Sequence, residues 1–186
     1  MQNHKQHGLS IRTVVAIGIG AAIVFLLKRF GSVPTGIPNT NIDTSYGFLA
    51  FFASLFGPVA GFIIGFLGHM LNDLTYGTPW WTWVITTGIL GGIIGLFWKR
   101  FDVEGGNFGT KKIISFNVLQ IIANLGCWVL LAPTLDILVY SEPANKVYLQ
   151  GIVSGISNAV STGVIGTILL VIYAASRTKR GSLKQE

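Results

Sequence analysis

The side chains best suited to chemistry are polar groups that recur at helical spacing inside otherwise apolar stretches. Residues three, four or seven positions apart lie on one face of a helix, and hydrocarbon penalises polar groups unless they face protein or water. Three such stripes occur: Gly65, His69, Asn72, Asp73 and Tyr76; Asn117, Gln120 and Asn124; and Gln150, Ser154, Ser157, Asn158 and Ser161. Together with the outer-loop amides Asn39 and Asn41, they predict the lining of one pocket.

The same amides have a structural alternative, because Ser, Asn and Gln also hydrogen-bond between membrane helices to hold a bundle together. Asn117, Gln120 and Ser161 fit this structural role better, whereas Asn124 and Asn158 fit either role. His69 and Asp73 are one helical turn apart. An ionisable pair at the end of a span favours a functional site.

Tryptophans form a second cluster, in the segment Pro79-Trp80-Trp81-Thr82-Trp83. Trp at a membrane boundary usually anchors the helix there, which accounts for at least one of the three. Indole faces also stack on flat rings, and neighbouring amides can bind ring nitrogens and hydroxyls. Trp80, Trp81 and Trp83 are therefore candidate contacts for a flat, polar, heteroaromatic ligand.

The composition indicates that these residues lie on membrane-spanning helices. The 186 residues are 51% hydrophobic and 11% charged, with 24 glycines, and their mean hydropathy is +0.61. Long apolar runs with few charges are typical of membrane spans. We predict an all-α integral membrane protein, a single domain over 1–186, with six transmembrane helices at about 11–28, 44–56, 59–76, 80–98, 113–135 and 147–175. Gly57-Pro58 would form a tight turn between two spans, and Cys127 a buried apolar position.

Lys and Arg positions set the orientation, since these residues are more frequent in cytoplasmic loops. With both termini cytoplasmic, the inner side carries most of them, and the outer side only Lys28, Arg29 and Lys146. The loops 28–43, 73–80 and 136–146 then face outward. The net charge of +6 is explained by topology, so we expect no nucleic-acid partner. The predicted location is the cell membrane.

Catalytic signatures are weak. The sequence has no G-x-x-x-x-G-K-[ST] phosphate loop and no H-E-x-x-H zinc motif. An intramembrane serine protease is disfavoured because Ser157 is followed by Asn158 and not by a glycine. We expect no catalytic residue, no metal and no cofactor.

Three stretches carry a family resemblance: Gly36-Ile-Pro-Asn-Thr-Asn41; Phe56-Gly-Pro-Val-Ala-Gly-Phe-Ile-Ile-Gly65 with Gly68-His69; and Gly77-Thr-Pro-Trp-Trp-Thr-Trp83. In their order, and in length and layout, the chain resembles the substrate-binding S components of energy-coupling factor (ECF) vitamin transporters. It is most similar to the branch often labelled riboflavin-type or hydroxymethylpyrimidine-type.

The resemblance implies a vitamin-binding subunit with its site at the outer face, covered by the loop 31–43. It implies docking onto a transmembrane coupling subunit that is driven by two cytoplasmic ATPases. Ala16 with Gly20, and Gly18 with Ala22, form two small-xxx-small pairs that let another helix approach. The resemblance implies that Ala16 and Gly20 make that contact, while packing inside the chain is the alternative.

Two classes of function remain open at this point. One is the vitamin-binding subunit of an ATP-driven importer. The other is a self-sufficient secondary transporter, which would need ion-coupling residues near the midplane and often shows internal repeats. Neither feature is found in the sequence, which favours the first class. Hydroxymethylpyrimidine or pyridoxine is the expected ligand, and riboflavin the alternative.

Overall fold

The computed structural model describes residues 9–38 and 40–177. The elements are α1 (Ile11–Phe30), β1 (Ser32–Pro34), β2 (Asn41–Asp43), α2 (Ser45–Leu74), α3 (Trp81–Gly95), α4 (Trp98–Phe101), α5 (Thr110–Leu125), η1 (Gly126–Leu131), α6 (Ala132–Tyr140), α7 (Ala144–Ser161), η2 (Thr162–Gly166) and α8 (Thr167–Ala175). The elements η1 and η2 are π-helical turns that join α5 to α6 and α7 to α8. Asn39 lies outside the described residues.

Four helical segments of the described chain are long and apolar enough to cross a membrane: Ile11–Phe30, Ser45–Leu74, Thr110–Tyr140 and Ala144–Ala175. Trp81–Gly95 is a shorter apolar helix. The expectation of a helical membrane protein is thereby confirmed. The small antiparallel pair β1–β2, with Val33 opposite Ile42, is an addition that the sequence did not predict.

Within α2 the chain reverses direction at Gly57. This glycine has φ 86° and ψ −175°, outside the helical region, and Pro58 follows it. A Cβ on Gly61 would lie 2.8 Å from Cβ of Ala53, and one on Gly65 would lie 3.2 Å from Leu49. In a continuous helix Leu49 and Gly65 would be about 24 Å apart along the axis. The segments 45–56 and 58–74 therefore form an antiparallel hairpin around the expected Gly57-Pro58 turn.

The fifth helical segment is longer than expected. We predicted a span over 113–135 followed by a loop over 136–146, but α6 continues to Tyr140 and α7 begins at Ala144. Pro133 does not end the helix: it lies just after the π-helical turn η1, and the helix continues through it to Tyr140. Asp136 is consequently a helical residue and not a loop residue.

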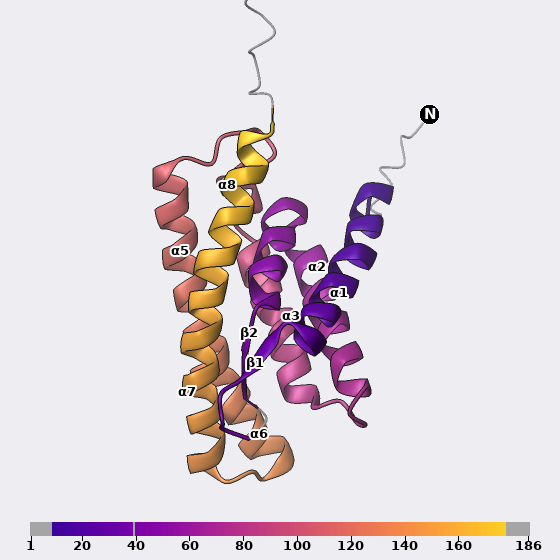
Figure 1. Cartoon of the computed structure of the whole chain (residues 1–186), viewed down its shortest axis with the longest axis vertical. Coiled ribbons are helices and arrows are strands. Elements are labelled where there is room, and N and C mark those ends of the chain that lie inside the picture. Colours follow the sequence, from indigo (N-terminus) through magenta and orange to yellow (C-terminus); the bar gives the residue numbers. More distant parts are fainter. Residues whose placement is uncertain (1–8, 39, 178–186) are drawn as a thin grey trace, which may run out of the picture.

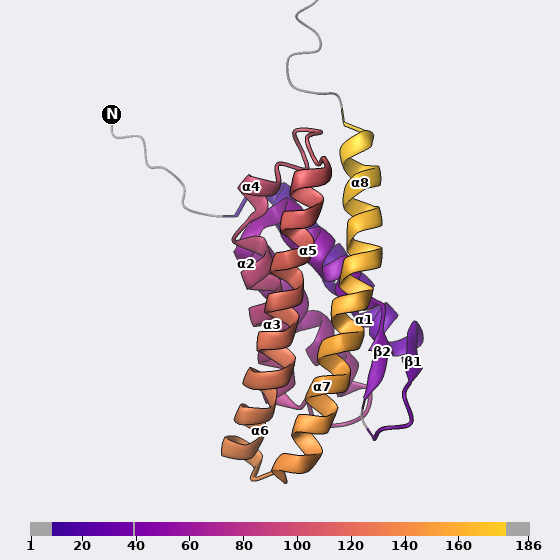
Figure 2. The same cartoon turned by 90° about the vertical axis from the view of Figure 1, so that its left-hand side faces the viewer.

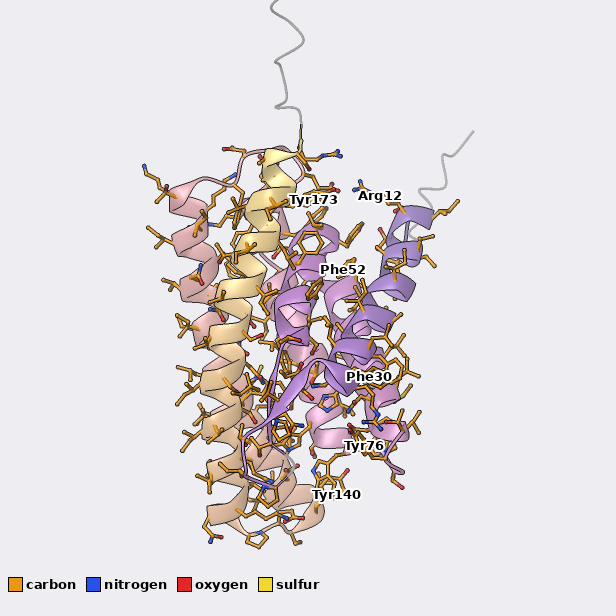
Figure 3. The ribbon with its side chains drawn as sticks, in the orientation of Figure 1. Arg12, Phe30, Phe52, Tyr76, Tyr140 and Tyr173 are labelled. Carbon is orange, nitrogen blue, oxygen red and sulfur yellow. The ribbon has the colours of Figure 1, made fainter. Side chains whose placement is uncertain are left out.

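The molecule has two parts, visible in Figure 1 and, after a quarter turn, in Figure 2. The segments α5–α6 and α7–α8 run along the long axis, and α1, α2 and α3 lie beside them. The start of α1 and the end of α8 lie at the same end of the molecule. In Figure 3, Arg12 and Tyr173 are near each other at that end, where Arg12 donates a hydrogen bond to Tyr173 Oη at 3.5 Å.

Glycines allow α2 and α3 to pack backbone against backbone. A Cβ on Gly61 would meet the carbonyl oxygen of Gly91 at 2.3 Å, and a Cβ on Gly91 would meet that of Gly61 at 2.2 Å. Small residues at such crossings are typical of membrane helix pairs. This contact fixes the position of α3, which carries the tryptophan segment at its start.

The two small-residue pairs of α1 point in different directions. Ala16 and Gly20 are buried, and a Cβ on Gly20 would meet Ile64 at 2.8 Å and Phe52 at 3.2 Å. Gly18 and Ala22 are exposed, and nothing lies within 4 Å of a Cβ on Gly18. The face expected to dock, Ala16 with Gly20, is therefore used inside the chain, and Gly18 with Ala22 forms the open face.

Candidate ligand-binding site

A cavity of about 520 Å³ lies at the end of the molecule opposite the chain termini, between the two parts of the fold. Most of the residues expected to bind a ligand line it: Asn41, His69, Asn72, Asp73, Tyr76, Trp80, Trp83 and Asn158. They come from β2, the second arm of α2 (58–74), the segment between α2 and α3, the start of α3, and α7. The predicted stripes on separate helices thus converge on one site.

Two of the expected residues lie elsewhere. Trp81 is not in the cavity lining; it is 43% exposed on the outside of the helix pair and stacks on Phe66 with ring centroids 6.3 Å apart. Asn124 is fully buried. It donates to the backbone oxygen of Gln120 at 2.9 Å and accepts from Trp128 Nε1 at 3.2 Å. Trp81 therefore fits the membrane-boundary role, and Asn124 the structural role.

Asp136 organises the tryptophan segment. Trp80 Nε1 donates to its Oδ1 at 2.9 Å and Trp83 Nε1 donates to its Oδ2 at 2.7 Å, while the Thr82 hydroxyl also donates to Oδ1. The carboxylate is 2% exposed. Three donors satisfy this buried charge and hold both indoles at fixed angles on the cavity wall.

The opposite wall is held by a buried ion pair at the end of α1. Lys28 Nζ donates to Asp43 Oδ2 at 2.5 Å and to Tyr46 Oη at 3.2 Å. Both charged side chains are 8% exposed. Asp43 also accepts from the Ser45 backbone N–H at 2.8 Å. This pair fixes β2 and the start of α2 against α1, so the strand pair is held at the cavity.

His69 and Asp73 lie side by side on the second arm of α2. His69 Nδ1 is 2.6 Å from the Thr87 hydroxyl, and its Nε2 is 3.5 Å from Asp73 Oδ1. Asp73 Oδ2 accepts from the Trp80 backbone N–H at 3.0 Å and Oδ1 from Asn72 Nδ2 at 3.1 Å. The expected pair is thus assembled at the cavity and tied to the tryptophan segment.

The described part of the loop 31–43 contacts α7. Gln150 Nε2 donates to the Pro38 carbonyl oxygen at 2.8 Å. Ser32 and Asn41 of the strand pair line the cavity. This contact joins residues 112 positions apart and holds this part of the loop beside the cavity.

A series of amides on α5, Asn117, Gln120 and Asn124, lies between the cavity and the end with the helix termini. Gln120 Nε2 donates to the Ala159 carbonyl oxygen at 3.1 Å, and Asn117 Nδ2 to the Thr167 hydroxyl at 2.9 Å. These bonds link α5 to α7 and α8, so Asn117 and Gln120 fit the structural role. Trp128, one helical turn after Asn124, packs against Trp83 with ring centroids 5.2 Å apart.

Several lining residues were missed from the sequence, chiefly Lys28, Asp43, Tyr46, Asp136, Glu142 and Lys146. Most of them lay in or beside segments that we took for outer loops. The charges of Lys28 and Lys146 were read as topology signals, although charged groups close to a polar helix stripe also indicate a site. No cluster of His, Cys, Asp and Glu within 9–38 and 40–177 could hold a metal ion.

Comparison with known proteins identifies the class. The family model described as "ECF-type riboflavin transporter, S component" matches residues 8–175. A UPF0397 protein of Lacticaseibacillus casei is 74% identical over 182 residues, covering 97% of this chain and 98% of the relative. UPF0397 proteins of Clostridium perfringens and Staphylococcus aureus are 58% and 54% identical over 183 residues; each covers 98% of this chain, with 99% and 100% of the relatives matched. No solved structure matches the chain.

The helical fold with a polar pocket at one end is that of a multi-pass membrane binding protein. The chain belongs to the family of ECF-type transporter S components. This family consists of vitamin-binding membrane subunits of ECF transporters, so the expected family and the cell-membrane location are confirmed. Family membership implies association with the transmembrane subunit and the ATPases of the ECF module, and a role in transport.

Proposed function

We propose that this chain captures hydroxymethylpyrimidine or pyridoxine at the outer membrane face and delivers it to an ECF importer. The observation that carries the proposal is the convergence of Trp80, Trp83, His69 and Asn158 on one cavity of about 520 Å³. Flat walls with a few fixed polar groups suit a planar heteroaromatic solute. The whole chain acts as one substrate-binding domain in this proposal.

Six membrane crossings with both termini cytoplasmic are part of the same proposal. Five of them are α1, the second arm of α2, α3, α5–α6 and α7–α8, and the sixth is the arm 45–56 of about 18 Å. Support comes from the charges at the two ends. The end with the helix termini carries Arg12, Lys99, Arg100, Lys111, Lys112 and Arg177, and the cavity end carries Lys28, Arg29 and Lys146.

Riboflavin is the second candidate, because the family model carries that name. The volume of the cavity is in the range of small-molecule sites and does not separate a single-ring from a three-ring ligand. The distinction must therefore come from the polar groups of the site.

The test is to purify the full chain from cells in mild detergent and identify the small molecules that remain bound. Mass spectrometry should detect a pyrimidine or pyridine vitamin or precursor in about equimolar amount. A matched preparation with Trp83→Leu should carry much less of it. Recovery of no heteroaromatic compound, and no binding of any when added back, would refute the proposal.

A further inference from the structure

A second cavity lies on the outside of the α2–α3 pair and is open to the surroundings. It has a volume of about 430 Å³, and its lining residues come from the ranges 58–63 of α2 and 89–96 of α3 with its C-cap. All of these lining residues are apolar. They belong to the half of the helix pair that lies away from the ligand cavity. We refer to this second cavity as the α2–α3 groove.

Gly92 forms the floor of the groove. A Cβ on Gly92 would have Phe62 Cβ and the Pro58 carbonyl oxygen as its nearest neighbours, both at 3.8 Å. A Cβ on the preceding Gly91 would instead meet the Gly61 carbonyl oxygen at 2.2 Å, in the contact between the two helices. The backbones therefore touch on the inner side, and the glycine on the outer side leaves a space that a larger residue would fill.

Aromatic rings close the groove toward the ligand cavity. A Cβ on Gly88, one turn before Gly92, would meet the Phe62 ring at 3.0 Å. The Phe62 ring stacks on Phe66, with centroids 6.0 Å apart, and Phe66 stacks on Trp81. The outer seam between α2 and α3 is thus filled by rings in the half near the ligand cavity, and the groove occupies the other half.

An indole and a lysine lie at the other end of the groove. The helix α4 begins at Trp98, two positions after the lining residue Leu96, and Figure 2 shows it at the end of the molecule with the helix termini. A Cβ on Gly57 would lie 3.3 Å from Trp98 Nε1, so this indole rests on the turn beside Pro58. Lys99 Nζ is 5.7 Å from the centroid of the Trp98 ring. Tryptophan at such a position is typical of the membrane–water interface.

Lys99 and Arg100 supply positive charge at this end. Both residues are exposed. No ion pair of the described residues includes either of them, and the acidic residues that follow, Asp102 and Glu104, pair with other basic groups. The groove therefore combines an apolar floor with two unneutralised cations at its mouth.

The length of the groove suits a lipid tail. Residues 89–96 extend about 10 Å along the helix axis, which is about two thirds of the roughly 15 Å of hydrocarbon in one leaflet. An acyl chain enters from the headgroup side and ends within its leaflet, as the groove ends at Phe62. A partner helix would cross the whole membrane and would need small residues along the full seam, but the ring stack occupies half of that seam.

We propose that the α2–α3 groove binds one anionic phospholipid, with an acyl chain over Gly92 and the phosphate beside Lys99 and Arg100. Basic pockets between membrane helices bind anionic headgroups. The Trp98 N–H is suited to donate to an oxygen at the interface. This site is separate from the ligand cavity, and the proposal holds whichever vitamin that cavity binds.

The test is native mass spectrometry of the full chain, released from micelles that contain phosphatidylglycerol and phosphatidylcholine with identical acyl chains in equal amounts. We expect one phosphatidylglycerol to remain on each chain, in at least about tenfold excess over phosphatidylcholine, since each basic residue beside an anionic lipid strengthens binding about fivefold. Gly92→Leu should remove most of the retained lipid, because its Cβ has room and its side chain fills the groove. Gly126→Leu, at an open position elsewhere, is the matched control and should retain the lipid.

The basic residues are tested in the same way. Lys99→Gln and Arg100→Gln should each reduce the preference for phosphatidylglycerol about fivefold. Lys111→Gln is the control, since Lys111 is also an exposed basic residue at this end of the molecule but lies on α5. An equal loss of preference in the control would show that the chain attracts anionic lipid through its overall charge, and it would overturn the proposed site.

Equal retention of the two lipids, or retention of neither, would also overturn the inference. Full lipid retention by Gly92→Leu would place the lipid outside the groove. If that variant kept its lipid but no longer copurified with the coupling subunit, the groove would be a protein-docking surface and the inference would be wrong. The two lipids are compared on the unchanged chain, so their ratio is decisive even if Gly92→Leu does not fold.

Discussion

At the scale of single residues, Asp136 joins α6 to the tryptophan segment at the cavity. It accepts hydrogen bonds from Trp80, Thr82 and Trp83 and so fixes how the indoles of Trp80 and Trp83 face the cavity. A substitution that removes one of these hydrogen bonds leaves the other two in place, so the contribution of each bond to ligand affinity can be measured separately.

Trp83→Phe should weaken ligand binding by about tenfold, because it removes one charge-assisted hydrogen bond to Asp136 and part of the stacking surface. Trp81→Phe should leave affinity unchanged, since Trp81 stacks on Phe66 outside the cavity. The affinities of both variants for the copurifying ligand are measured by titration calorimetry. The opposite ranking would mean that Trp81 contacts the ligand.

Lys28→Met should lower the free energy of unfolding by about 3–5 kcal/mol, because it leaves the Asp43 charge buried without a partner. The double variant Lys28→Met with Asp43→Asn should recover most of that loss, since no charge then remains buried. The comparison uses denaturant unfolding in one detergent. A double variant as unstable as the single one would indicate that the lysine matters for packing and not for charge.

For single residues, the informative signal in the sequence was the side of the helix on which each residue lies. Trp80 and Trp83 are three residues apart and face the cavity together, while Trp81 lies on another face; the sequence contained this distinction. The role of Asp136 was not predictable, because it depends on α6 continuing beyond the expected end of the span. The Lys28–Asp43 pair depends on a loop that brings the two residues back together, and spacing along the chain does not encode it.

At the scale of elements, α3 packs closely against the two arms of α2, and glycines at the contacts allow this close approach. Gly61 and Gly91 meet through their backbones, and the reversal at Gly57 uses a positive φ that glycine tolerates best. This unit carries His69, Asp73 and the tryptophan segment, so its packing determines the geometry of half the site.

Gly61→Ala should destabilise the protein by about 1–3 kcal/mol, because the new methyl group would meet the Gly91 carbonyl oxygen and force the helices apart. Gly126→Ala is the matched control, since nothing lies within 4 Å of a Cβ there. It should be neutral or slightly stabilising. Thermal unfolding in detergent measures both, and equal midpoints would show that α2 and α3 are not in contact at Gly61.

Gly18→Leu should leave ligand binding and folded yield unchanged and prevent copurification with the coupling subunit, since Gly18 lies on the open face of α1. Gly20→Leu should reduce the folded yield, because its side chain would meet Ile64 and Phe52. The readout is affinity purification of the assembled transporter. Normal assembly of the Gly18 variant would place the docking surface elsewhere.

The pattern of small residues identified both faces of α1 but not their roles. Ala16 with Gly20 and Gly18 with Ala22 have the same spacing and chemistry, so only the position of α2 distinguishes them. The reversal at Gly57-Pro58 was predictable from its turn residues. The π-helical turn η1 was not, because nothing in the segment Gly126–Leu131 distinguishes it from an ordinary helical turn.

At the scale of the whole molecule, the described chain ends lie together at the end opposite the cavity. Hydropathy and charge were enough to predict this arrangement, because lipid restricts the choice to spanning helices. The position of α1 beside α2, and the separation of α5–α8 from the rest, depend on side-chain packing and were not predictable from hydropathy.

Cysteine labelling tests the orientation. Cys127 is buried and is the only cysteine of the chain, so Cys127→Ala provides a background without reactive thiols. In that background Thr78→Cys, at the cavity, should react with a membrane-impermeant maleimide in intact cells. Gly109→Cys, at the opposite end, should react only in inverted vesicles. Labelling of Gly109→Cys in intact cells would reverse the orientation.

The positions of the tryptophans should make ligand binding detectable by intrinsic fluorescence. Of the five tryptophans, Trp80 and Trp83 line the cavity and Trp128 packs against Trp83. Trp81 and Trp98 lie outside it and supply a constant emission. A planar solute stacked on the first two should quench their emission and, through ring contact, that of Trp128. Occupancy can then be followed in real time without a dye or a radioactive tracer.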